Sequence, residues 1–525
     1  MYLKLLVAIS ALIVAATPLA LRAQAAGDSV AVNVKWDAVV LVSETVPTTQ
    51  HLANAFTLRS SPLNKKLLQD LRDLHTNDTR LQLWFSVPNQ VIAELKEPTA
   101  TETFWDFTYM DPVVVDFFAN TQGIRHINIG TIPRWMFNVP PVEVPSDPAA
   151  SFYPYTNGTT GDLLKDPTGK QFADFQARIF SWYTQGGFTD EIGKYHKSGY
   201  HFKIDYWGVL NEPSIENHIS VEEYTVIFDA VAEAIHKIDP NVQFMGPEIV
   251  GAPYVLPFAR YFLNPKNHNP SAPPVQWFSF HNYVMANNDP AAWQGKFFTS
   301  PPGEKDFGVP ALPFADQLRE VIKVRNELSP NTKIALDELG TFDGLKLFDF
   351  SDPNSSNPAN TTEPYSAYSP LYWVASGGNW AVNFIIAENQ GVPLISMTQM
   401  VGAPTQSESC SMINWDTAQP NAHYRVLQLI NSNFGPGDKL VDTQSSSHDV
   451  VAQASITPSG QKILLVNTSN QTVLVDIANA LHGSSLHLEL VDEASGEQPP
   501  RAEHTSGQSV TLAPFAVAVV SAGGK

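Results

Sequence analysis

The chain has 525 residues, of which 43% are hydrophobic and 16% are charged, and its formal net charge is −20. This composition excludes a disordered chain, and the length favours one large domain accompanied by a smaller one. The 32 basic residues form no run that could neutralise a row of phosphates, so we expect no nucleic-acid partner. The single cysteine, Cys410, excludes an intramolecular disulfide and a cysteine-based zinc cluster.

Residues 1–25 are predicted to be a secretory signal peptide. Lys4 precedes an apolar stretch over 5–16, and Ala23-Gln24-Ala25 provides the small-x-small pattern that signal peptidase cleaves. The alternative is a membrane anchor, but the apolar run is short for a bilayer and Pro18 interrupts it. We therefore expect a mature chain without a membrane span that is secreted or periplasmic.

Residues 35–437 are predicted to form an α/β domain, because short apolar runs alternate there with segments of helical period. Helices are expected around 63–74, 172–182, 220–238, 314–328 and 421–432. Strands are expected near 38–43 and at 80–86, 124–132, 203–211, 242–249, 275–283, 333–339 and 380–387. Eight parallel strands close a barrel, so the predicted fold is a (β/α)8 TIM barrel.

Three long insertions, over 138–168, 284–312 and 342–369, each follow a predicted strand and precede the next helix. They are therefore expected at one end of the barrel, the end where such folds build their active sites.

The pattern changes at residue 438. From there to residue 525, short β-rich runs follow one another with no helix between them, over 450–456, 462–466, 472–477, 486–491 and 510–520. This spacing predicts an accessory C-terminal β-sandwich. Residues 29–34 alternate valine with polar side chains and are a candidate N-terminal strand of the same sandwich.

Two predicted strands end in a glutamate. The apolar run 204–210 ends in Asn211-Glu212-Pro213 on the fourth strand, and 334–336 ends in Asp337-Glu338 on the seventh. Both carboxylates then lie at the C-terminal rim of the barrel. Paired carboxyl groups suit glycoside hydrolysis, in which a protonated acid donates to the leaving oxygen and an ionised partner attacks the sugar. For either glutamate alone, a capping or salt-bridged carboxylate is the more common interpretation.

The end of the predicted sixth strand carries His281-Asn282-Tyr283. A tyrosine there is placed to hydrogen-bond Glu338 and keep it ionised, although core packing is the ordinary interpretation of an isolated His-x-Tyr. The 14 histidines are dispersed without metal-ligand spacing, so we predict no catalytic metal and no cofactor.

Further substrate-binding candidates are aromatic or basic. Trp84, Trp135 and Trp415 are candidate platforms for sugar faces, with core packing as the alternative. Arg134 is a candidate partner for a uronate carboxylate, with a solvated loop arginine as the alternative.

With these motifs, the chain resembles the glycoside hydrolases of clan A, and most closely family 39, which contains β-xylosidases and α-L-iduronidases. The resemblance rests on the segments 107–111, 130–136, 207–213 and 281–283. It implies that Glu212 is the general acid/base, Glu338 the nucleophile and Asn211 a hydrogen-bond donor to the sugar 2-hydroxyl. It also implies that Tyr283 is the partner of Glu338 and that His281 is part of the substrate site.

The sequence departs from family 39 on the second strand. An Arg-x-His motif is expected there, whereas 81–86 reads Leu-Gln-Leu-Trp-Phe-Ser, which leaves the sugar specificity open.

The function predicted from the sequence is that of a secreted retaining glycoside hydrolase, β-xylosidase-like, with a carbohydrate substrate. A transglycosidase that uses the same residues is one alternative. A non-catalytic carbohydrate-binding protein on a glycosidase scaffold is another. The sugar, its anomer, exo or endo action and the oligomeric state stay open.

Overall fold

The computed structural model describes residues 29–286, 293, 305–306, 309–310, 312–343, 365–402, 408–481 and 485–522. The predicted signal peptide, 1–25, lies outside these residues, as does most of the predicted insertions 284–312 and 342–369. Within the described ranges, no helix combines the length and apolar character needed to cross a membrane.

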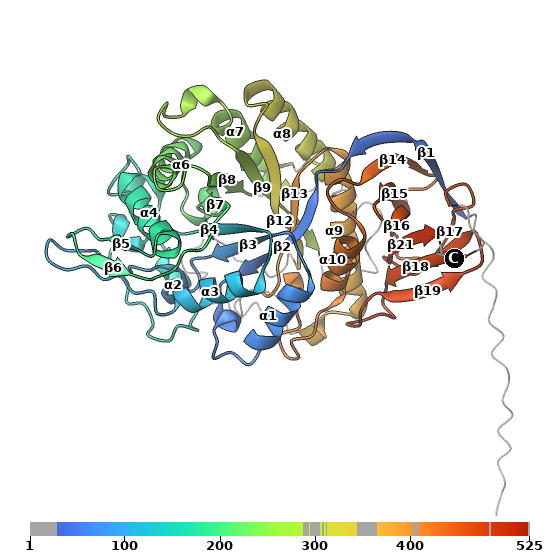
Figure 1. Cartoon of the computed structure of the whole chain (residues 1–525), viewed down its shortest axis with the longest axis horizontal. Coiled ribbons are helices and arrows are strands. Elements are labelled where there is room, and N and C mark those ends of the chain that lie inside the picture. Colours follow the sequence, from blue (N-terminus) through green and yellow to red (C-terminus); the bar gives the residue numbers. More distant parts are fainter. Residues whose placement is uncertain are drawn as a thin grey trace, which may run out of the picture.

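Eight parallel strands close into a barrel at the centre of the larger domain (Figure 1), which confirms the predicted (β/α)8 fold. Around the barrel they follow the order β12-β13-β2-β3-β4-β7-β8-β9. In chain order they are β2 (Val46–Leu52), β3 (Asp78–Leu83), β4 (Ile124–Ile129), β7 (Tyr206–Val209), β8 (Gln243–Ile249), β9 (Trp277–Ala286), β12 (Lys333–Asp343) and β13 (Leu394–Met397).

The α-helices of the described chain surround this barrel. They are α1 (Asn64–Asp73), α2 (Pro88–Val91), α3 (Met110–Asn120), α4 (Lys170–Thr184), α5 (Pro213–Glu216), α6 (Val221–His236), α7 (Ala252–Phe262), α8 (Phe314–Leu328), α9 (Pro370–Asn389) and α10 (Ala422–Asn433). Two short hairpins lie outside the barrel, formed by β5 (Gly187–Thr189) with β6 (Tyr195–Lys197) and by β10 (Lys305–Asp306) with β11 (Val309–Pro310).

The helix signals in the sequence locate α6 well. Ser220 accepts a hydrogen bond from the Glu223 backbone while the Glu223 side chain accepts one from the Ser220 backbone, which is the capping box that the sequence predicts. The predicted helices at 314–328 and 421–432 correspond to α8 and α10.

The predicted first barrel strand, 38–43, is wrong. Residues 35–42 belong to β1 (Val30–Val42), which pairs with β14 (Lys439–Ser445) of the C-terminal sheet. The first barrel strand is β2, whose Thr48, Thr49, Gln50 and His51 are all buried. Because these buried side chains are polar, β2 does not appear as an apolar run in the sequence.

The predicted eighth strand, 380–387, is also wrong, because these residues lie inside α9. Most of α9 is buried, since it lies between the barrel and the C-terminal sheet. A helix covered all round has no polar face, so its sequence shows an apolar run without the helical period. The eighth strand is the four-residue β13.

The C-terminal domain contains nine strands in the order β19-β18-β21-β16-β15-β14-β1-β17-β20. Beyond β1 and β14 these are β15 (Val450–Thr457), β16 (Gly460–Asn467), β17 (Val473–Asp476), β18 (Leu486–Val491), β19 (Arg501–Thr505), β20 (Ser509–Leu512) and β21 (Val517–Ala522). The pairs are antiparallel except β1 with β17, which is parallel. The N-terminal strand therefore completes a sheet whose other strands come from the end of the chain.

The sandwich packs against the barrel through β16. Ile463 and Leu465 lie in the core of the sandwich, whereas Leu464 and Val466 lie in the core that is continuous with the barrel. Lys462 Nζ donates to Asn433 Oδ1 of α10 at 2.6 Å beside this interface. Both faces of β16 are covered, which explains its unbroken apolar run.

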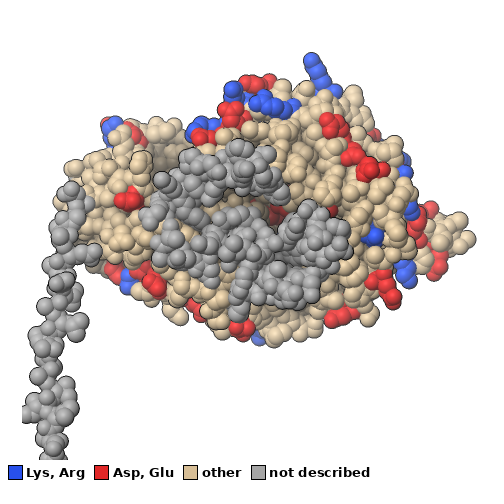
Figure 2. Space-filling model, turned by 180° about the vertical axis from the view of Figure 1, so that it is seen from behind, with Lys and Arg blue, Asp and Glu red and all other residues tan. Residues whose placement is uncertain are grey.

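Charged side chains are interspersed on the surface. Figure 2 shows Lys and Arg in small groups among Asp and Glu, without a continuous basic stripe on the visible face.

We expect the sandwich to depend on β1. Val32 is 1% exposed in its core, whereas Val40 of the same strand is 62% exposed. Val32→Asp should lower the free energy of unfolding by about 3–5 kcal/mol, because it buries an unpaired charge. Val40→Asp is the matched control and should change it by less than about 0.5 kcal/mol. Calorimetric unfolding of both variants checks this, and equal midpoints would contradict it.

Candidate active site

The backbone at the ends of β8 and β12 aims carboxyl groups into the barrel. Along β12, Ala335 pairs with Ser279 and Glu338 pairs with His281, so β12 has one residue more than β9 over this interval. Such a bulge interrupts the alternation of side chains, which lets the neighbouring Asp337 and Glu338 both reach His281. A similar irregularity in β8 surrounds Glu248.

Three non-glycine residues with positive φ lie at this rim. They are Leu210 (63°), Glu212 (41°) and Glu248 (52°). Side chains disfavour this region, and such residues tend to cluster at functional sites where the surrounding structure holds them. Here the Glu212 N–H donates to the Glu248 carbonyl at 3.0 Å, which joins the two strained positions.

Glu212 and Glu338 form the centre of the candidate site. One carboxylate oxygen of Glu212, one of Glu338 and one ring nitrogen of His281 all lie within 4.8 Å of one another. His281 Nδ1 hydrogen-bonds Glu212 Oε1 at 2.8 Å and lies 3.5 Å from Glu338 Oε2. The Glu212 side chain is 13% exposed and that of Glu338 is 6% exposed, so both carboxylates are largely enclosed.

Glu338 is held in its ionised form. Arg80 Nη1 donates to one oxygen of Glu338 and the Tyr283 hydroxyl donates to the other. Burial is the largest single influence on the pKa of Glu338 and raises it. The positive charges of His281 and Arg80, with the hydrogen bonds from Tyr283 and Arg80, outweigh burial, and the pKa lies below its ordinary value.

The pKa of Glu212 is displaced in the opposite direction, above its ordinary value. Burial raises the pKa of Glu212, and the negative charge of Glu338 raises it further. The hydrogen bond and charge of His281 oppose this rise without cancelling it. The two neighbouring carboxyl groups therefore have pKa values displaced in opposite directions.

Arg80 connects the polar groups inside the barrel. Besides Glu338, it donates to Gln50 and Glu248, and Nη2 donates to Asn211 Oδ1 at 2.9 Å. Its Nε lies 3.8 Å from Asp337. Arg80 is 1% exposed, so these contacts replace the water that its guanidinium loses on burial.

Glu248 is fully buried in this group. Burial raises the pKa of Glu248 to about 8 against the opposing charge of Arg80. Asn128 Nδ2 donates to it at 2.8 Å. A Cβ at Gly208 would lie 2.3 Å from Glu248 Oε1, so glycine leaves the space that this carboxyl group occupies.

Asn211 and Trp84 meet through a third glutamate. Asn211 Nδ2 and Trp84 Nε1 both donate to Glu216 Oε1, each at 2.8 Å. Burial raises the pKa of Glu216 well above its ordinary value. An amide NH2 carries two donors, and the bond to Glu216 uses one of those on Asn211.

The other substrate-binding candidates have different partners in the structure. Trp135 Nε1 donates to the backbone carbonyl of Glu94 at 2.8 Å, and Trp415 Nε1 donates to the Ser411 hydroxyl at 3.2 Å. The buried Arg134 donates to three backbone carbonyls, those of Pro140, Tyr155 and Asn157. This guanidinium holds a loop through backbone carbonyls and is not solvated, since Arg134 is 8% exposed.

Arg80, like Glu216 and Glu248, is a residue of the site that was not predicted from the sequence. The strand reads Arg80-Leu81-Gln82, so the Arg-x-His motif is absent although the arginine is present. The alternation Arg80-Leu81-Gln82-Leu83-Trp84 contains the signal, because an arginine inside a strand covered by helices must point into the barrel and find acids there.

Two groups of side chains have metal-ligand atoms close together, namely Glu212, His281 and Glu338, and Glu248, His281 and Asp337. Arg80 bonds one carboxylate of each group. A fixed cation therefore already faces one acid of each of these two groups, which are those found among the described residues.

Comparison with known proteins identifies the fold. The chain is similar to an α-L-arabinofuranosidase from Thermotoga maritima, with 15% identity, a TM-score of 0.60, and coverage of 94% of this chain and 99% of that chain. It is similar to a glucosidase from Croceicoccus marinus, with 12% identity, a TM-score of 0.58 and coverage of 94% and 99%. It is also similar to a β-xylosidase of glycoside hydrolase family 39 from Caulobacter crescentus, with 13% identity, a TM-score of 0.55 and coverage of 94% and 99%.

The C-terminal domain matches a family model of its own. Residues 447–520 match the C-terminal immunoglobulin-like domain of D-apionate lactonase. The comparison with curated proteins gives no match. The barrel with its β-sandwich is thus the fold found in solved structures of clan A glycoside hydrolases.

We expect Arg80→Met to destabilise the protein by about 3–5 kcal/mol at neutral pH, because it leaves buried carboxylates without their cation. Without that cation the pKa of Glu338 rises, and the pKa of Glu248, already about 8 in the wild type, rises further. The folded variant then binds more protons than the unfolded chain, so its loss of stability relative to the wild type becomes smaller as pH falls from 8 to 5.

Thermal unfolding of this variant between pH 8 and 5 checks the expectation. Arg319→Met, at an arginine whose side chain is 63% exposed, is the control and should shift the midpoint little at any pH. A pH-independent loss in Arg80→Met would contradict the electrostatic explanation.

Proposed function

We propose that this chain is a retaining glycoside hydrolase that cleaves O-glycosidic bonds by double displacement. The observation that carries the proposal is the pair formed by Glu212 and Glu338, whose carboxyl groups are close together and have pKa values displaced in opposite directions. A protonated acid beside an ionised carboxylate is the starting state of this reaction.

In the first step, Glu212 donates its proton to the glycosidic oxygen while the Glu338 carboxylate attacks the anomeric carbon. The bond between that carbon and the leaving oxygen breaks, and a glycosyl ester of Glu338 forms. The leaving group departs as a neutral alcohol. His281, hydrogen-bonded to Glu212, then faces the new Glu212 carboxylate and stabilises its charge.

In the second step, the Glu212 carboxylate takes a proton from water, and the water oxygen attacks the anomeric carbon. The ester bond to Glu338 breaks and its electron pair returns to the carboxylate, where Arg80 and Tyr283 donate hydrogen bonds. Two inversions give net retention.

The spacing of the two carboxylates supports retention. Retaining enzymes hold these groups about 5–5.5 Å apart, whereas inverting enzymes separate them by about 6.5–9.5 Å to admit a water. Oxygens of Glu212 and Glu338 lie within 4.8 Å of each other, which favours direct attack by Glu338.

For the sugar, we propose a xylose-containing glycan and β-xylosidase-like activity. The sequence resemblance to family 39 and the similarity to the Caulobacter crescentus β-xylosidase support this choice. We also propose that the protein is secreted or periplasmic, which rests on the signal-peptide pattern of residues 1–25.

Aryl glycosides test the roles of the two glutamates. On a p-nitrophenyl panel (xyloside, arabinofuranoside, glucoside, galactoside, iduronide), Glu338→Ala should lower kcat/KM by about 10⁴-fold or more, because no nucleophile remains. Glu212→Ala should retain more activity, since p-nitrophenolate leaves with little help from an acid. Azide should restore turnover in Glu212→Ala and yield a glycosyl azide of retained configuration.

The exposed Glu222 provides the matched control for these variants, since Glu222→Gln should match the wild type. Hydrolysis that survives Glu338→Ala would overturn the mechanism. Glycan binding by the wild type without any turnover would instead favour a binding protein.

The pH profile gives a second test. Activity requires Glu338 ionised and Glu212 protonated. We therefore expect kcat/KM to decrease at pH values below the lowered pKa of Glu338 and again at pH values above the raised pKa of Glu212. Tyr283→Phe removes a hydrogen bond that lowers the pKa of Glu338, so the acid limb should move to higher pH. Tyr195→Phe, at a tyrosine that is 58% exposed, should leave both limbs in place.

A further inference from the structure

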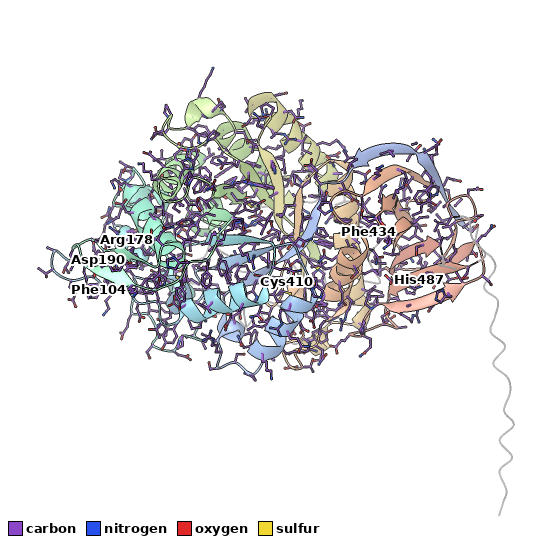
Figure 3. All side chains as sticks on the ribbon, viewed as in Figure 1. Phe104, Arg178, Asp190, Cys410, Phe434 and His487 are labelled. Atoms are coloured by element: carbon purple, nitrogen blue, oxygen red, sulfur yellow. The ribbon has the colours of Figure 1, made fainter. Side chains whose placement is uncertain are left out.

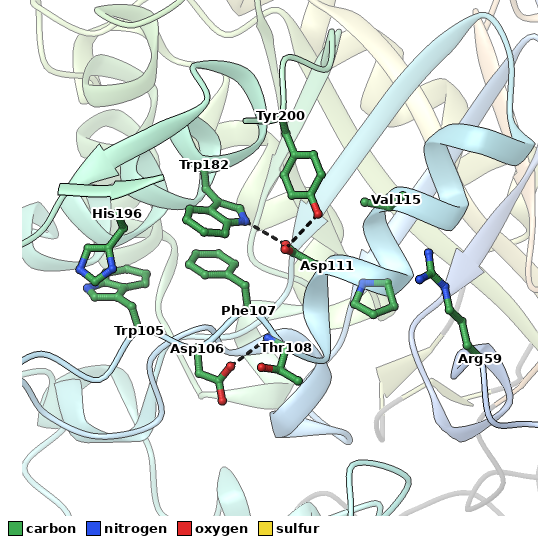
Figure 4. A pocket seen from close by; sticks show the side chains of 11 residues that line it. Arg59, Trp105, Asp106, Phe107, Thr108, Asp111, Val115, Trp182, His196 and Tyr200 are labelled. Carbon is green, nitrogen blue, oxygen red and sulfur yellow. Dashed lines mark hydrogen bonds between the residues drawn. The ribbon is translucent and has the colours of Figure 1, made fainter. Parts of the chain in front are cut away.

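A second cavity lies on the outside of the barrel (Figure 4). It has a volume of about 520 Å³ and is lined by residues of the loop before α3, the start of α3, the end of α4 and the segment that follows β5. We call it the aromatic pocket and define it by Trp105, Asp106, Phe107, Thr108, Trp182 and Tyr200. Its lining includes none of the residues around Glu212 and Glu338.

The aromatic pocket lies at the end of the molecule that is remote from the sandwich. Figure 3 shows Phe104, Arg178 and Asp190 together at this end, by α4 and β5, and His487 of β18 at the opposite end. Asp190 hydrogen-bonds His196, a lining residue of the cavity, at 2.8 Å. A ligand held here would therefore contact neither the sandwich nor the carboxylate pair.

Flat aromatic rings form one wall of the aromatic pocket. Phe107 is nearly parallel to both of its neighbours, at 10° to Trp105 and 11° to Trp182, with centroid distances of 6.0 and 4.1 Å. Trp105 and Trp182 are only half-buried. Trp105 also stacks on Phe175 at a centroid distance of 5.3 Å, so the exposed parts of Trp105 and Trp182 are the apolar surface available to the CH groups of a sugar.

Hydrogen bonds fix these rings before any ligand arrives. Asp111 accepts from Trp182 Nε1 at 2.8 Å and from the Tyr200 hydroxyl at 3.2 Å. Trp105 Nε1 donates to Glu191 at 3.0 Å. Because the rings are already oriented, binding would cost little side-chain entropy.

Polar groups with exposed positions stand at the edge of the rings. Asp106 and Thr108 are both exposed, and the Asp106 carboxylate accepts from the Thr108 backbone at 2.9 Å. Arg59, another lining residue, is paired with Asp116 at 2.7 Å. The edge thus offers acceptors and donors for hydroxyl groups, and the carboxylates of Asp106 and Asp111 disfavour an anionic ligand.

We propose that the aromatic pocket is a second carbohydrate-binding site, which holds a neutral sugar residue of a polymeric glycan away from the cleavage site. The sugar class rests on the proposed function, whereas the location rests on the cavity itself. Its volume falls within the range of small-molecule sites, about 300–1,000 Å³. Holding one part of a chain raises the effective concentration of the rest near the carboxylate pair.

The test measures binding in the full chain carrying Glu338→Ala, so that no probe is consumed. Affinity electrophoresis measures binding to arabinoxylan, arabinan and mixed-linkage β-glucan. The chain with Glu338→Ala alone is compared with two variants that carry either Trp105→Ala or Thr108→Trp in addition. The first removes a ring, and the second fills the aromatic pocket from an exposed position. Each should weaken binding to at least one glycan about tenfold. Trp36→Ala, at a half-buried tryptophan of β1, is the matched control.

The same pocket variants with Glu338 intact should keep kcat/KM on p-nitrophenyl glycosides within about twofold, because a single sugar does not reach both sites. Unchanged glycan binding in both pocket variants, or no binding to any of the three glycans, would overturn the second site even if aryl glycosides are hydrolysed. If the pocket variants lose glycan binding and the chain with Glu338 intact hydrolyses no glycoside, the result would support the aromatic pocket and overturn the proposed function.

Discussion

The guanidinium of Arg80 is the interaction on which the centre of the barrel depends. Four carboxyl groups, those of Glu212, Glu248, Asp337 and Glu338, converge there with Arg80 and His281 as the facing cations. Burial alone would raise the pKa of Glu212, Glu248 and Glu338. Arg80 donates to Glu338 and Glu248, and in the described part of the chain it donates no hydrogen bond to Glu212. Because the hydrogen-bond donors are distributed unequally, the pKa of Glu338 is lowered and that of Glu212 is raised, although both carboxyl groups are largely buried.

The backbone creates this inequality before any side chain is considered. Regular strands would point Asp337 and Glu338 to opposite faces, and the bulge in β12 brings both toward His281. The positive φ values of Glu212 and Glu248 are disfavoured conformations that the surrounding barrel maintains. The local strain and the electrostatic asymmetry therefore have one origin, the shape of the strand ends.

The sequence predicts those parts of the fold whose signals are local. The capping box at Ser220 locates α6, and the buried runs that end in Glu212 and Glu338 locate two barrel strands. The two wrong strand predictions, 38–43 and 380–387, share a physical cause. In both cases the side chains that are buried do not follow the hydrophobic pattern expected for the element. The strand β2 carries Gln50 and other polar groups into the barrel, and α9 is covered on both faces. The contact between Arg80 and Glu248 forms only when strands distant in sequence meet across the interior, so the sequence does not pair these residues.

The position of the sandwich follows from the same packing argument. Because α9 has few exposed residues, it needs cover on the side turned away from the barrel, and β16 supplies it with Leu464 and Val466. The strand β1 joins the beginning of the chain to this cover through its pairing with β14. The barrel and the sandwich thus share a continuous apolar core, so the sandwich supports the helices behind β13 and β2. The carboxylate pair depends on those strands, because Gln50 of β2 accepts a hydrogen bond from Arg80.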